Sequence, residues 1–414
     1  MLLLCCLAAP LAAQQGIPGQ ATALARAGNL DSALVLLSQA RSTDPNDPDL
    51  QLAHAKVLGW AGQKRDAVAL YDTMLTRNPG NADARVGLGY VYHWQGRERA
   101  ASGQADSALA LDSTNADALA LRRAIRAATR GTMESSANWS NDSDHNTNFW
   151  QTHSVSIGLS DGLRLLGSVA VLEASDPVRD AWRYGGEAGL RLAIGALQAS
   201  ALAGARRLEP DQLGGRTAAT YRGSLRWHPD SRLGLGAGYA RYPFDDTALL
   251  IGLDLDVESL EGGFDAHPAS GLVLTGGGGA LWISDGNRRT EAQAAITQDL
   301  SRRFTVGVSG RALGYRTAGF GYFSPDRFHL LEGTVAVKVG NARWDGQLDG
   351  GLGAQQIGRN GDTQSEWRIE ARVGKNWGNG NRAEGFGKVT NSAVSSTTGA
   401  FRYRTAGVVL RLGL

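Results

Sequence analysis

From residue 132 to residue 414 the chain alternates apolar and polar residues in a long series of runs separated by turns. The run 182–194 is an example. Its apolar positions are Trp182, Tyr184, Ala188, Leu190, Leu192 and Ile194, and its charged positions are Arg183, Glu187 and Arg191. Because successive side chains of a β-strand point to opposite faces, each run predicts a strand with one apolar face. A soluble sandwich buries that face in its core, whereas an outer-membrane barrel turns it toward lipid and points the charges into a wet lumen.

The turns between these runs separate the two alternatives. Short turns fall at Asp161-Gly162, Gly195-Ala196, Pro229-Asp230-Ser231, Ser270-Gly271, Arg302-Arg303, Asn341-Ala342 and Gly378-Asn379-Gly380. Longer polar loops fall between them, at 141–147, 176–180, 210–216, 319–326 and 360–365. Outer-membrane barrels have short turns on the periplasmic rim and longer loops on the other. We count about 16 runs with strand character, and an even number places the barrel's start on the same rim as Leu414. The region 132–414 is therefore predicted to be an antiparallel transmembrane β-barrel.

The aromatic residues also favour a lipid-facing surface. Trp367 and Trp377 lie on the apolar face of the run 366–377, ten residues apart. At about 3.3 Å per residue and a tilt of about 45° they span roughly 23 Å, close to the roughly 25 Å apolar band of such barrels. Further tryptophans lie near predicted strand ends, at positions 139, 150, 182, 227, 282 and 344. The last run, 405–414, resembles the C-terminal assembly signal of bacterial outer-membrane proteins.

The first residues are nearly all apolar and end in small residues. This resembles a secretory signal, predicted over residues 1–13, although no Lys or Arg precedes the apolar run. A lipoprotein site at Leu4-Cys5 is the alternative. Cys5 and Cys6 both leave with the signal on the first interpretation, so we expect no disulfide in the mature chain.

Between residues 14 and 130 the chain repeats with a period of 34 residues. Positions in register are Gly28, Gly62 and Gly96; Ala33, Ala67 and Ala101; Ala40, Met74 and Ala108; Pro45, Pro79 and Ser113; and Asp49, Asp83 and Asp117. A 34-residue helix-turn-helix period with these small residues resembles the tetratricopeptide repeat. The resemblance implies about three repeats and a capping helix, 116–129, that present a concave surface to a partner protein.

Aromatic residues of the repeats are candidates for partner binding, with Trp60, Tyr90 and Trp94 foremost. The alternatives are that these residues only pack the helices, and that the repeats only space the barrel from another component.

A five-residue motif suggests a family for the barrel. Residues 321–325 read Gly-Tyr-Phe-Ser-Pro and follow a predicted strand, so that Tyr322, Phe323, Ser324 and Pro325 lie on a loop. The motif resembles a segment in the C-terminal barrel of the cellulose synthase operon protein C family, and the overall size is similar to that of YaiO-type repeat-plus-barrel proteins. The resemblance implies periplasmic repeats, an outer-membrane barrel that exports exopolysaccharide, and partners that include periplasmic or synthase-complex proteins. The repeat array is far shorter than in the first family.

Charged residues on the predicted inner face define a candidate lumen lining. They are Arg183, Glu187, Arg191, Arg222, Arg226, Asp254, Asp256, Glu258, Arg311, Glu332, Asp345, Asp349, Arg368, Glu370 and Arg372. The signs are mixed, and a ring of one sign would have indicated ion selectivity. Mixed charges suit a neutral, hydroxyl-rich glycan; the alternative is that they pair across the lumen and plug it.

Other functions receive less support. A formal net charge of +2 gives no field that favours nucleic acid. The acidic stretch 141–145 is expected to be solvated, and the glycine run 276–279 lacks the Lys-Ser/Thr and helix of a phosphate loop. We therefore predict no catalytic, cofactor or metal site.

The sequence as a whole predicts an α + β chain of two domains, a short tetratricopeptide array and a transmembrane barrel. We expect this chain to contact outer-membrane lipid and to serve exopolysaccharide export. A general solute porin, a non-conducting anchor whose repeats recruit a partner, and an enzyme remain as alternatives.

Overall fold

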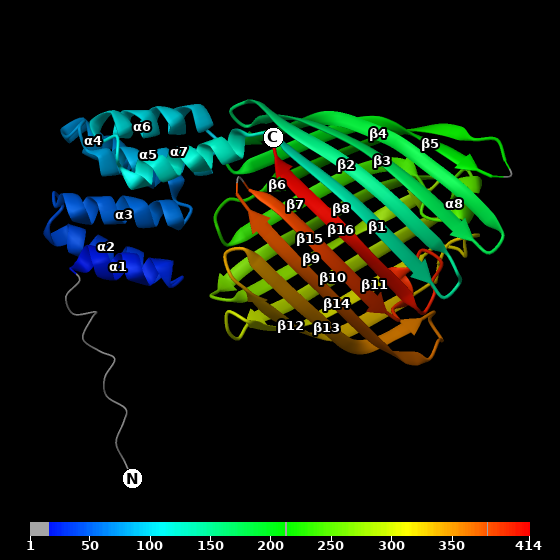
Figure 1. Cartoon of the computed structure of the whole chain (residues 1–414). Helices are drawn as coiled ribbons and strands as arrows, with labels where there is room; N and C mark the ends of the chain where they lie inside the picture. The colour runs from blue at the N-terminus through cyan, green and yellow to red at the C-terminus, as the bar shows by residue number, and fades with distance from the viewer. Residues whose placement is uncertain (1–15, 212, 379) are drawn as a thin grey trace, which may run out of the picture. The chain divides into compact units, whose positions relative to one another are not determined.

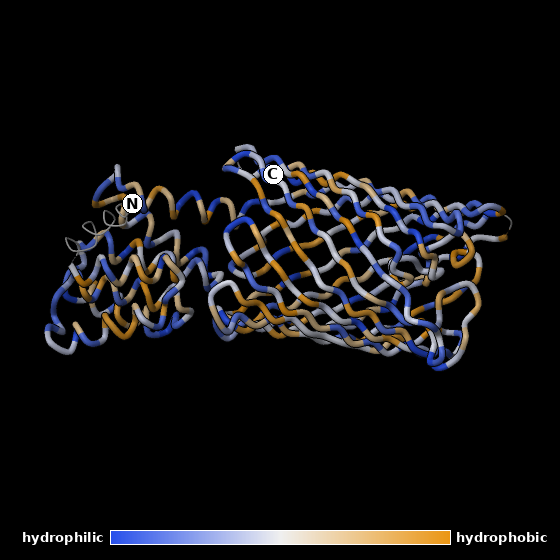
Figure 2. Tube along the Cα trace, turned by 90° about the horizontal axis from the view of Figure 1, so that it is seen from below, coloured by the Kyte–Doolittle hydropathy of each residue, from blue (hydrophilic) through white to orange (hydrophobic). Residues whose placement is uncertain are grey.

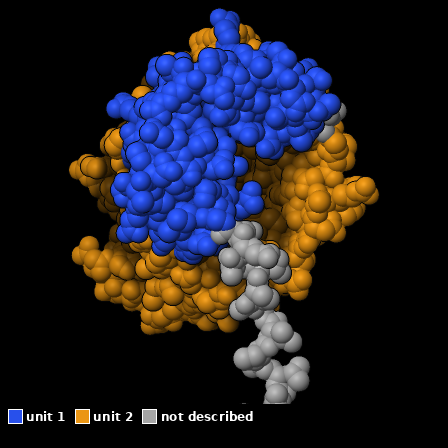
Figure 3. Space-filling model, turned by 90° about the vertical axis from the view of Figure 1, so that its left-hand side faces the viewer, with its two compact units in different colours: residues 1–129, 194–196, 229–231 blue, residues 130–193, 197–228, 232–414 orange. Residues whose placement is uncertain are grey.

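The computed structural model describes residues 16–211, 213–378 and 380–414 (Figure 1). They form two compact units, which are described separately (Figure 3): the helices up to Thr129, and the barrel wall from Arg130 onward. The predicted signal segment 1–13, with Cys5 and Cys6, lies outside the described residues. None of the described helices is long and apolar enough to cross a membrane.

The first unit contains antiparallel helix pairs. Its helices are α1 Ile17–Arg26, α2 Leu30–Thr43, α3 Pro48–Trp60, α4 Lys64–Arg77, α5 Ala82–Trp94, α6 Glu98–Leu111 and α7 Ala116–Thr129. Gly28, Gly62 and Gly96 lie in the turns with φ of 91°, 80° and 72°, a backbone conformation that glycine adopts without strain. The repeated alanines Ala33, Ala67 and Ala101 are fully buried, so the small side chains let paired helices approach as the period predicts.

The second unit is a closed antiparallel barrel. Within the described residues it has sixteen strands: β1 Thr132–Asp142, β2 Thr147–Ser160, β3 Leu163–Asp176, β4 Arg179–Ile194, β5 Leu197–Pro210, β6 Arg216–Trp227, β7 Leu233–Pro243, β8 Asp256–Ala269, β9 Leu272–Ile283, β10 Arg288–Asp299, β11 Phe304–Tyr315, β12 Phe328–Gly340, β13 Trp344–Ile357, β14 Thr363–Trp377, β15 Asn381–Thr390 and β16 Tyr403–Gly413. Each strand pairs with its neighbour in sequence, and β16 pairs with β1. The predicted fold class is confirmed.

The two rims of the barrel differ. One end, here called the short-turn rim, carries the turns predicted from the sequence together with both ends of the wall, where the Leu414 N–H donates to the Gly131 carbonyl (2.8 Å). The opposite end, the loop rim, carries the longer connections. Three of these, residues 244–255, 284–287 and 391–402, were not among the predicted loops, and the first contains a short helix, α8 Ala248–Gly252, at the right-hand end of the barrel in Figure 1.

The outer face of the wall is apolar, and hydrophobic and hydrophilic residues alternate along the strands in Figure 2. Leu352, Val335 and Ile369 are at least half exposed there. Tryptophans at 139, 182, 227, 282, 344, 367 and 377 are also exposed. Trp150 differs: it is half-buried against the cluster formed by Leu172 and Ala174, so its placement among the outward tryptophans was wrong. A wall that exposes its large apolar side chains all round is suited to lipid rather than to water.

Candidate functional site

Most of the predicted lumen residues lie on the inner face of the wall. Alternation fixes this, because their strand neighbours are the exposed apolar residues of the outer face: Arg183 follows Trp182, for example, and Arg368 follows Trp367. The predicted residues with this placement are Arg183, Glu187, Arg191, Arg222, Arg226, Arg311, Glu332, Asp345, Asp349, Arg368, Glu370 and Arg372.

The prediction is wrong for Asp254, Asp256 and Glu258. Asp254 lies in the loop before β8, with φ of 54°, and its side chain is 73 % exposed. Asp256 and Glu258 share the outer face with Leu260, and Glu258 lies opposite the exposed Trp282. A shift of one residue moves a whole set of side chains to the other face. The inner set of β8 therefore begins at Val257.

The inner charges are joined by ion pairs of mixed sign. These include Glu187–Arg222 (2.7 Å), Glu291–Arg311 (2.8 Å), Glu332–Arg368 (2.7 Å), Asp345–Arg382 (2.6 Å), Glu384–Arg382 (2.6 Å) and Glu370–Arg372. Four of these pairs join neighbouring or nearby strands, such as β4 to β6 and β12 to β14, and two lie within β14 or β15, so all of them line the wall. The lumen surface is consequently polar and carries no ring of a single sign.

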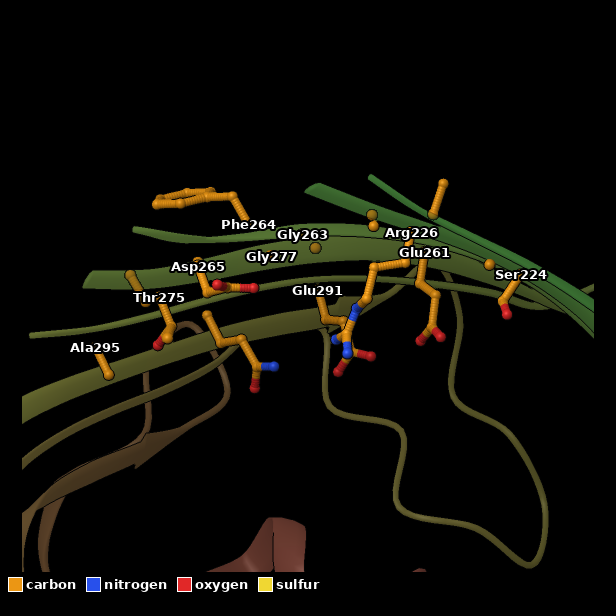
Figure 4. A pocket seen from close by; sticks show the side chains of 18 of the residues that line it. Ser224, Arg226, Glu261, Gly263, Phe264, Asp265, Thr275, Gly277, Glu291 and Ala295 are labelled. Carbon is orange, nitrogen blue, oxygen red and sulfur yellow. The ribbon is translucent and has the colours of Figure 1, made fainter. Parts of the chain in front are cut away.

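A cavity of about 1020 Å³ lies against the inner wall. Figure 4 shows Arg226, Glu261 and Glu291 pointing into it, with Phe264 on the opposite side of the sheet. Several inner positions of β7 to β9 are glycine, which leaves the space free. Arg226 and Glu261, and Arg191 farther round the wall, make no ion pair with any residue in the described ranges, so their charges are available to water or a solute.

The mouth of the barrel is filled by inward-folded loops. We call these loops, residues 244–255, 316–327 and 391–402, the mouth plug. Buried residues of the plug, Leu250, Tyr322 and Ala393, pack against inner-face residues of β8, β9, β11 and β12. The wall contributes Val257, Leu281, Ile283, Leu313, Tyr315 and Phe328 to this cluster. The lumen thus ends, at the loop rim, in an apolar core of the kind found in soluble proteins.

The predicted loop motif is part of this core. The Tyr322 hydroxyl donates to Asp285 Oδ2 (2.7 Å) and accepts from Asn287 Nδ2 (2.8 Å), and burial raises the pKa of the Tyr322 phenol. The Phe323 N–H donates to the Thr397 carbonyl (2.7 Å), which ties two plug loops together. The Ser324 Oγ accepts from the Gly319 N–H (2.7 Å). The carbonyl of Pro325, the last residue of the motif, accepts from the N–H of Tyr315, the last residue of β11 (2.9 Å).

Glycines make the close approach in the plug possible. Gly321 has φ of 85°, and a Cβ there would lie 2.8 Å from Leu253 Cδ1. Gly399 has φ of 83° and lies against the Phe323 ring. A side chain at either position would strain the backbone and separate the loops.

The helix α8 fastens the plug to a second part of the wall. Ala248 and Ile251 pack on inner residues of β3 to β5, among them Leu208. Beside them the buried Asp245 accepts from Arg206 (3.0 Å) and Arg183 (3.4 Å). Since β4 and β11 are seven places apart in the ring, the plug packs across the lumen between nearly opposite parts of the wall.

Sequence reasoning missed the loops 244–255 and 391–402. The signal for the first was present: residues 248–253 read Ala-Leu-Leu-Ile-Gly-Leu and do not alternate, and Thr247 is a helix N-cap residue. Its hydroxyl accepts from the Leu250 N–H (3.3 Å). The loop 391–402 is rich in Ser and Thr and has no pattern that predicts an inward course.

The candidate partner-binding residues lie on two helices of the first unit. Tyr90 and Trp94 on α5 have ring centroids 5.9 Å apart, and Trp94 is 38 % exposed. Trp60, at the end of α3, is half-buried beside Lys56, whose Nζ lies 5.5 Å from the ring centroid. Tyr71, in contrast, is buried, and burial raises the pKa of its phenol. Trp94 is the most accessible of the candidates.

Comparisons with known proteins agree with this architecture. A tetratricopeptide repeat family model matches residues 61–125. The solved structure described as a bacterial polysaccharide outer membrane secretin has a TM-score of 0.57 at 12 % identity, and the match covers 69 % of this chain and 99 % of that one. This chain joins tetratricopeptide repeats to an outer-membrane-type barrel. At 12 % identity the second match shows a shared fold and nothing more.

Two further solved structures match less well. CdiB from Acinetobacter baumannii has a TM-score of 0.45 at 10 % identity, over 68 % of this chain and 60 % of that one. YrrB, described as a TPR protein with an unusual peptide-binding site, has a TM-score of 0.24 at 21 % identity, over 26 % of this chain and 55 % of that one. A comparison with curated proteins gives no match.

Proposed function

We propose that this protein is a gated channel of the bacterial outer membrane that exports a polysaccharide. The observation that carries the proposal is the polar cavity of about 1020 Å³ inside a closed sixteen-strand wall of described residues. Barrels of about 16 strands are wide enough to leave an aqueous channel. The mouth plug is the gate.

The orientation follows from the rims. Short turns face the periplasm in outer-membrane barrels, so the short-turn rim is assigned to that side. Arg130 enters the wall at this rim, and the repeats therefore belong to the periplasm. There they recruit periplasmic or synthase-complex proteins, for which Trp94 offers an exposed aromatic contact.

The lumen chemistry favours a neutral glycan over an ion. Paired carboxylates and guanidinium groups offer donors and acceptors to hydroxyls without a barrier of one sign. The secretin with the same barrel fold is described as a polysaccharide protein, which supports the same substrate class here.

A non-conducting anchor is the second candidate, and the mouth plug is the observation that favours it. Its apolar core is buried as fully as that of a soluble domain, with Phe328 and Val257 inaccessible to solvent. If this core never opens, the barrel only holds the repeats at the membrane.

Planar-bilayer conductance decides between the candidates. The full chain is compared with a plug-opened variant in which residues 247–253 are replaced by two glycines. A control inserts two glycines into the turn 341–343 of the short-turn rim. We expect the full chain and the control to be silent, and the plug-opened variant to conduct and to be blocked by neutral oligosaccharides. Conductance indifferent to oligosaccharides would indicate a general solute porin, and a folded but silent plug-opened variant would leave the anchor.

A further inference from the structure

A second, smaller pocket lies at the mouth of the barrel, beneath the plug. Its volume is about 260 Å³, and none of the described residues that line it lines the central cavity. The pocket therefore admits a small polar molecule rather than a polymer segment of several units.

The lining combines flat aromatic rings with hydrogen-bonding groups. Trp150 of β2 and Tyr403 of β16 contribute the rings, and Asp142, Asn148, Arg183 and Thr397 contribute polar groups. Aromatic side chains offer an apolar face with a polar edge. A pyranose ring has the complementary surface, because its C–H groups form an apolar face and its hydroxyls surround the rim.

Two polar atoms of the lining residues have no hydrogen-bond partner in the part of the chain that the structure describes. Asn148 donates from Nδ2 to the Asp246 carbonyl (3.0 Å), which fixes its amide orientation and leaves Oδ1 as the acceptor. Asn148 Oδ1 and Arg183 Nε are both buried without a hydrogen bond to any described residue. Asn148 and Arg183 both line the pocket, and their amide and guanidinium groups match the hydrogen-bonding hydroxyls of a sugar.

The charges of the pocket select against an anion. Asp142 and Asp246 bring carboxylates to the lining, while the guanidinium of Arg183 is already engaged by Asp245 (3.4 Å). The Asp142 carboxylate accepts from Ser396 Oγ (2.7 Å), so it is held in place by the plug. An acidic sugar would meet the carboxylate of Asp142 at the wall of the pocket.

We propose that this pocket binds one neutral pyranose ring of a glycan at the mouth of the closed channel. The inference rests on the proposed export function, for which it supplies a recognition site. The side chains of Asn148 and Arg183 offer polar groups to the sugar hydroxyls, and Trp150 and Tyr403 contact the apolar face of the ring. Because Thr397 and Asp246 belong to the plug, an occupied pocket is coupled to the closed mouth.

The test is sugar binding by the full chain, folded in detergent, measured by saturation-transfer NMR and calorimetry. The probes are glucose, galactose, mannose and N-acetylglucosamine, with glucuronate as the anionic comparison. We expect at least one neutral sugar to bind and glucuronate to bind at least about tenfold more weakly.

Substitutions in the pocket lining, compared with a control on the outer face, test whether the sugar binds in this pocket. Asn148→Leu and Trp150→Leu should each weaken binding by about tenfold or more, since each removes a contact that the pocket supplies. Trp139→Leu is the control, because Trp139 lies on the neighbouring strand but on the outer face. Tyr403→Leu, which removes the second ring from a different strand, covers the case in which the Asn148 or Trp150 variant does not fold. Heat-modifiable migration on gels verifies folding.

Three results would overturn the inference: no binding of any neutral sugar, binding that Asn148→Leu and Tyr403→Leu leave unchanged, or preferred binding of glucuronate. These outcomes are separate from the conductance test. A plug-opened channel that oligosaccharides block, in a protein whose mouth pocket binds no sugar, would retain the export function and remove the pocket. Sugar binding by a protein that never conducts would retain the binding pocket and remove the export function.

Discussion

The wall of the barrel and its mouth plug are built by opposite rules. The wall exposes its large apolar residues, such as Leu352 and Leu331, and keeps its charges inside. The plug buries apolar residues such as Phe328 and Tyr322 in the same lumen, as a soluble protein does. The inner face of this barrel therefore divides into two parts: a wet stretch that water reaches, and a dry stretch that the inward-folded loops cover. Stability and conduction should therefore depend on different residues.

The largest expected effect is the loss of the wall itself. Deletion of residues 403–414 removes β16, which pairs with both β1 and β15. The remaining strands would expose unpaired backbone groups to lipid, at several kcal/mol for each group. We expect no folded barrel in membrane fractions, as measured by heat-modifiable migration and protease resistance. Recovery of a folded, membrane-inserted barrel would contradict the assignment of β16 as the closing strand.

A pair of phenylalanines sharpens the contrast between the two rules. Phe328 is fully buried under the plug, whereas Phe304 is 47 % exposed on the outer face. Phe328→Ala should lower the free energy of unfolding by about 3–5 kcal/mol, because it leaves a cavity in a packed core. Phe304→Ala should cost far less, because lipid or detergent fills the space that it leaves. Urea unfolding of both variants in the same detergent measures the difference, and equal losses would show that the plug is not a packed core.

The wall could be predicted from the sequence because its determinants are local. Alternation at period 2 fixes which side chains of β4 or β14 face inward, and turn residues such as Gly162 and Gly271 mark the strand ends. The 34-residue period fixes the repeats in the same way. Asp256 and Glu258 were misplaced because the sequence does not show where β8 begins after an unrecognised loop.

The plug could not be predicted, because long-range contacts determine it. Tyr322 contacts Asp285, Phe323 contacts Thr397, and Asp245 contacts Arg206, and these partners are 37 to 74 residues apart. No local sequence pattern determines whether a loop folds into the lumen or away from it. The mouth pocket depends on the same contacts, so Asn148 and Trp150 could not be recognised as site residues from the sequence.

A smaller effect is expected from the hydroxyl of Tyr322. Tyr322→Phe removes bonds to Asp285 and Asn287 and should destabilise the closed plug by about 1–3 kcal/mol. Because burial raises the pKa of this phenol, the plug favours its neutral form. The neutral phenol stabilises the closed plug fully at pH values below the ordinary tyrosine pKa of about 10. This stabilisation declines as the pH rises above that value.

The pH dependence of channel opening measures this effect. The full chain should remain closed from pH 7 to about 10 and should open more often above pH 10. The Tyr322→Phe variant should already open more often than the full chain at pH 7. Its opening should show no further increase at alkaline pH from ionisation of this phenol. Tyr239→Phe, on the outer face, is the control. An identical alkaline rise in the full chain and in Tyr322→Phe would remove the phenol from the gate.

The smallest expected effect concerns the wet stretch of the lumen. Arg226 and Glu261 line the cavity, and neither makes an ion pair among the described residues. In the plug-opened variant, Arg226→Gln should shift the reversal potential toward cation selectivity, and Glu261→Gln should shift it toward anion selectivity. Each shift should be a few millivolts in dilute salt and vanish near 1 M salt, where screening acts over about 3 Å. Shifts of the same sign would mean that these side chains do not face the conducting path, and the wet stretch would have to lie along another part of the wall.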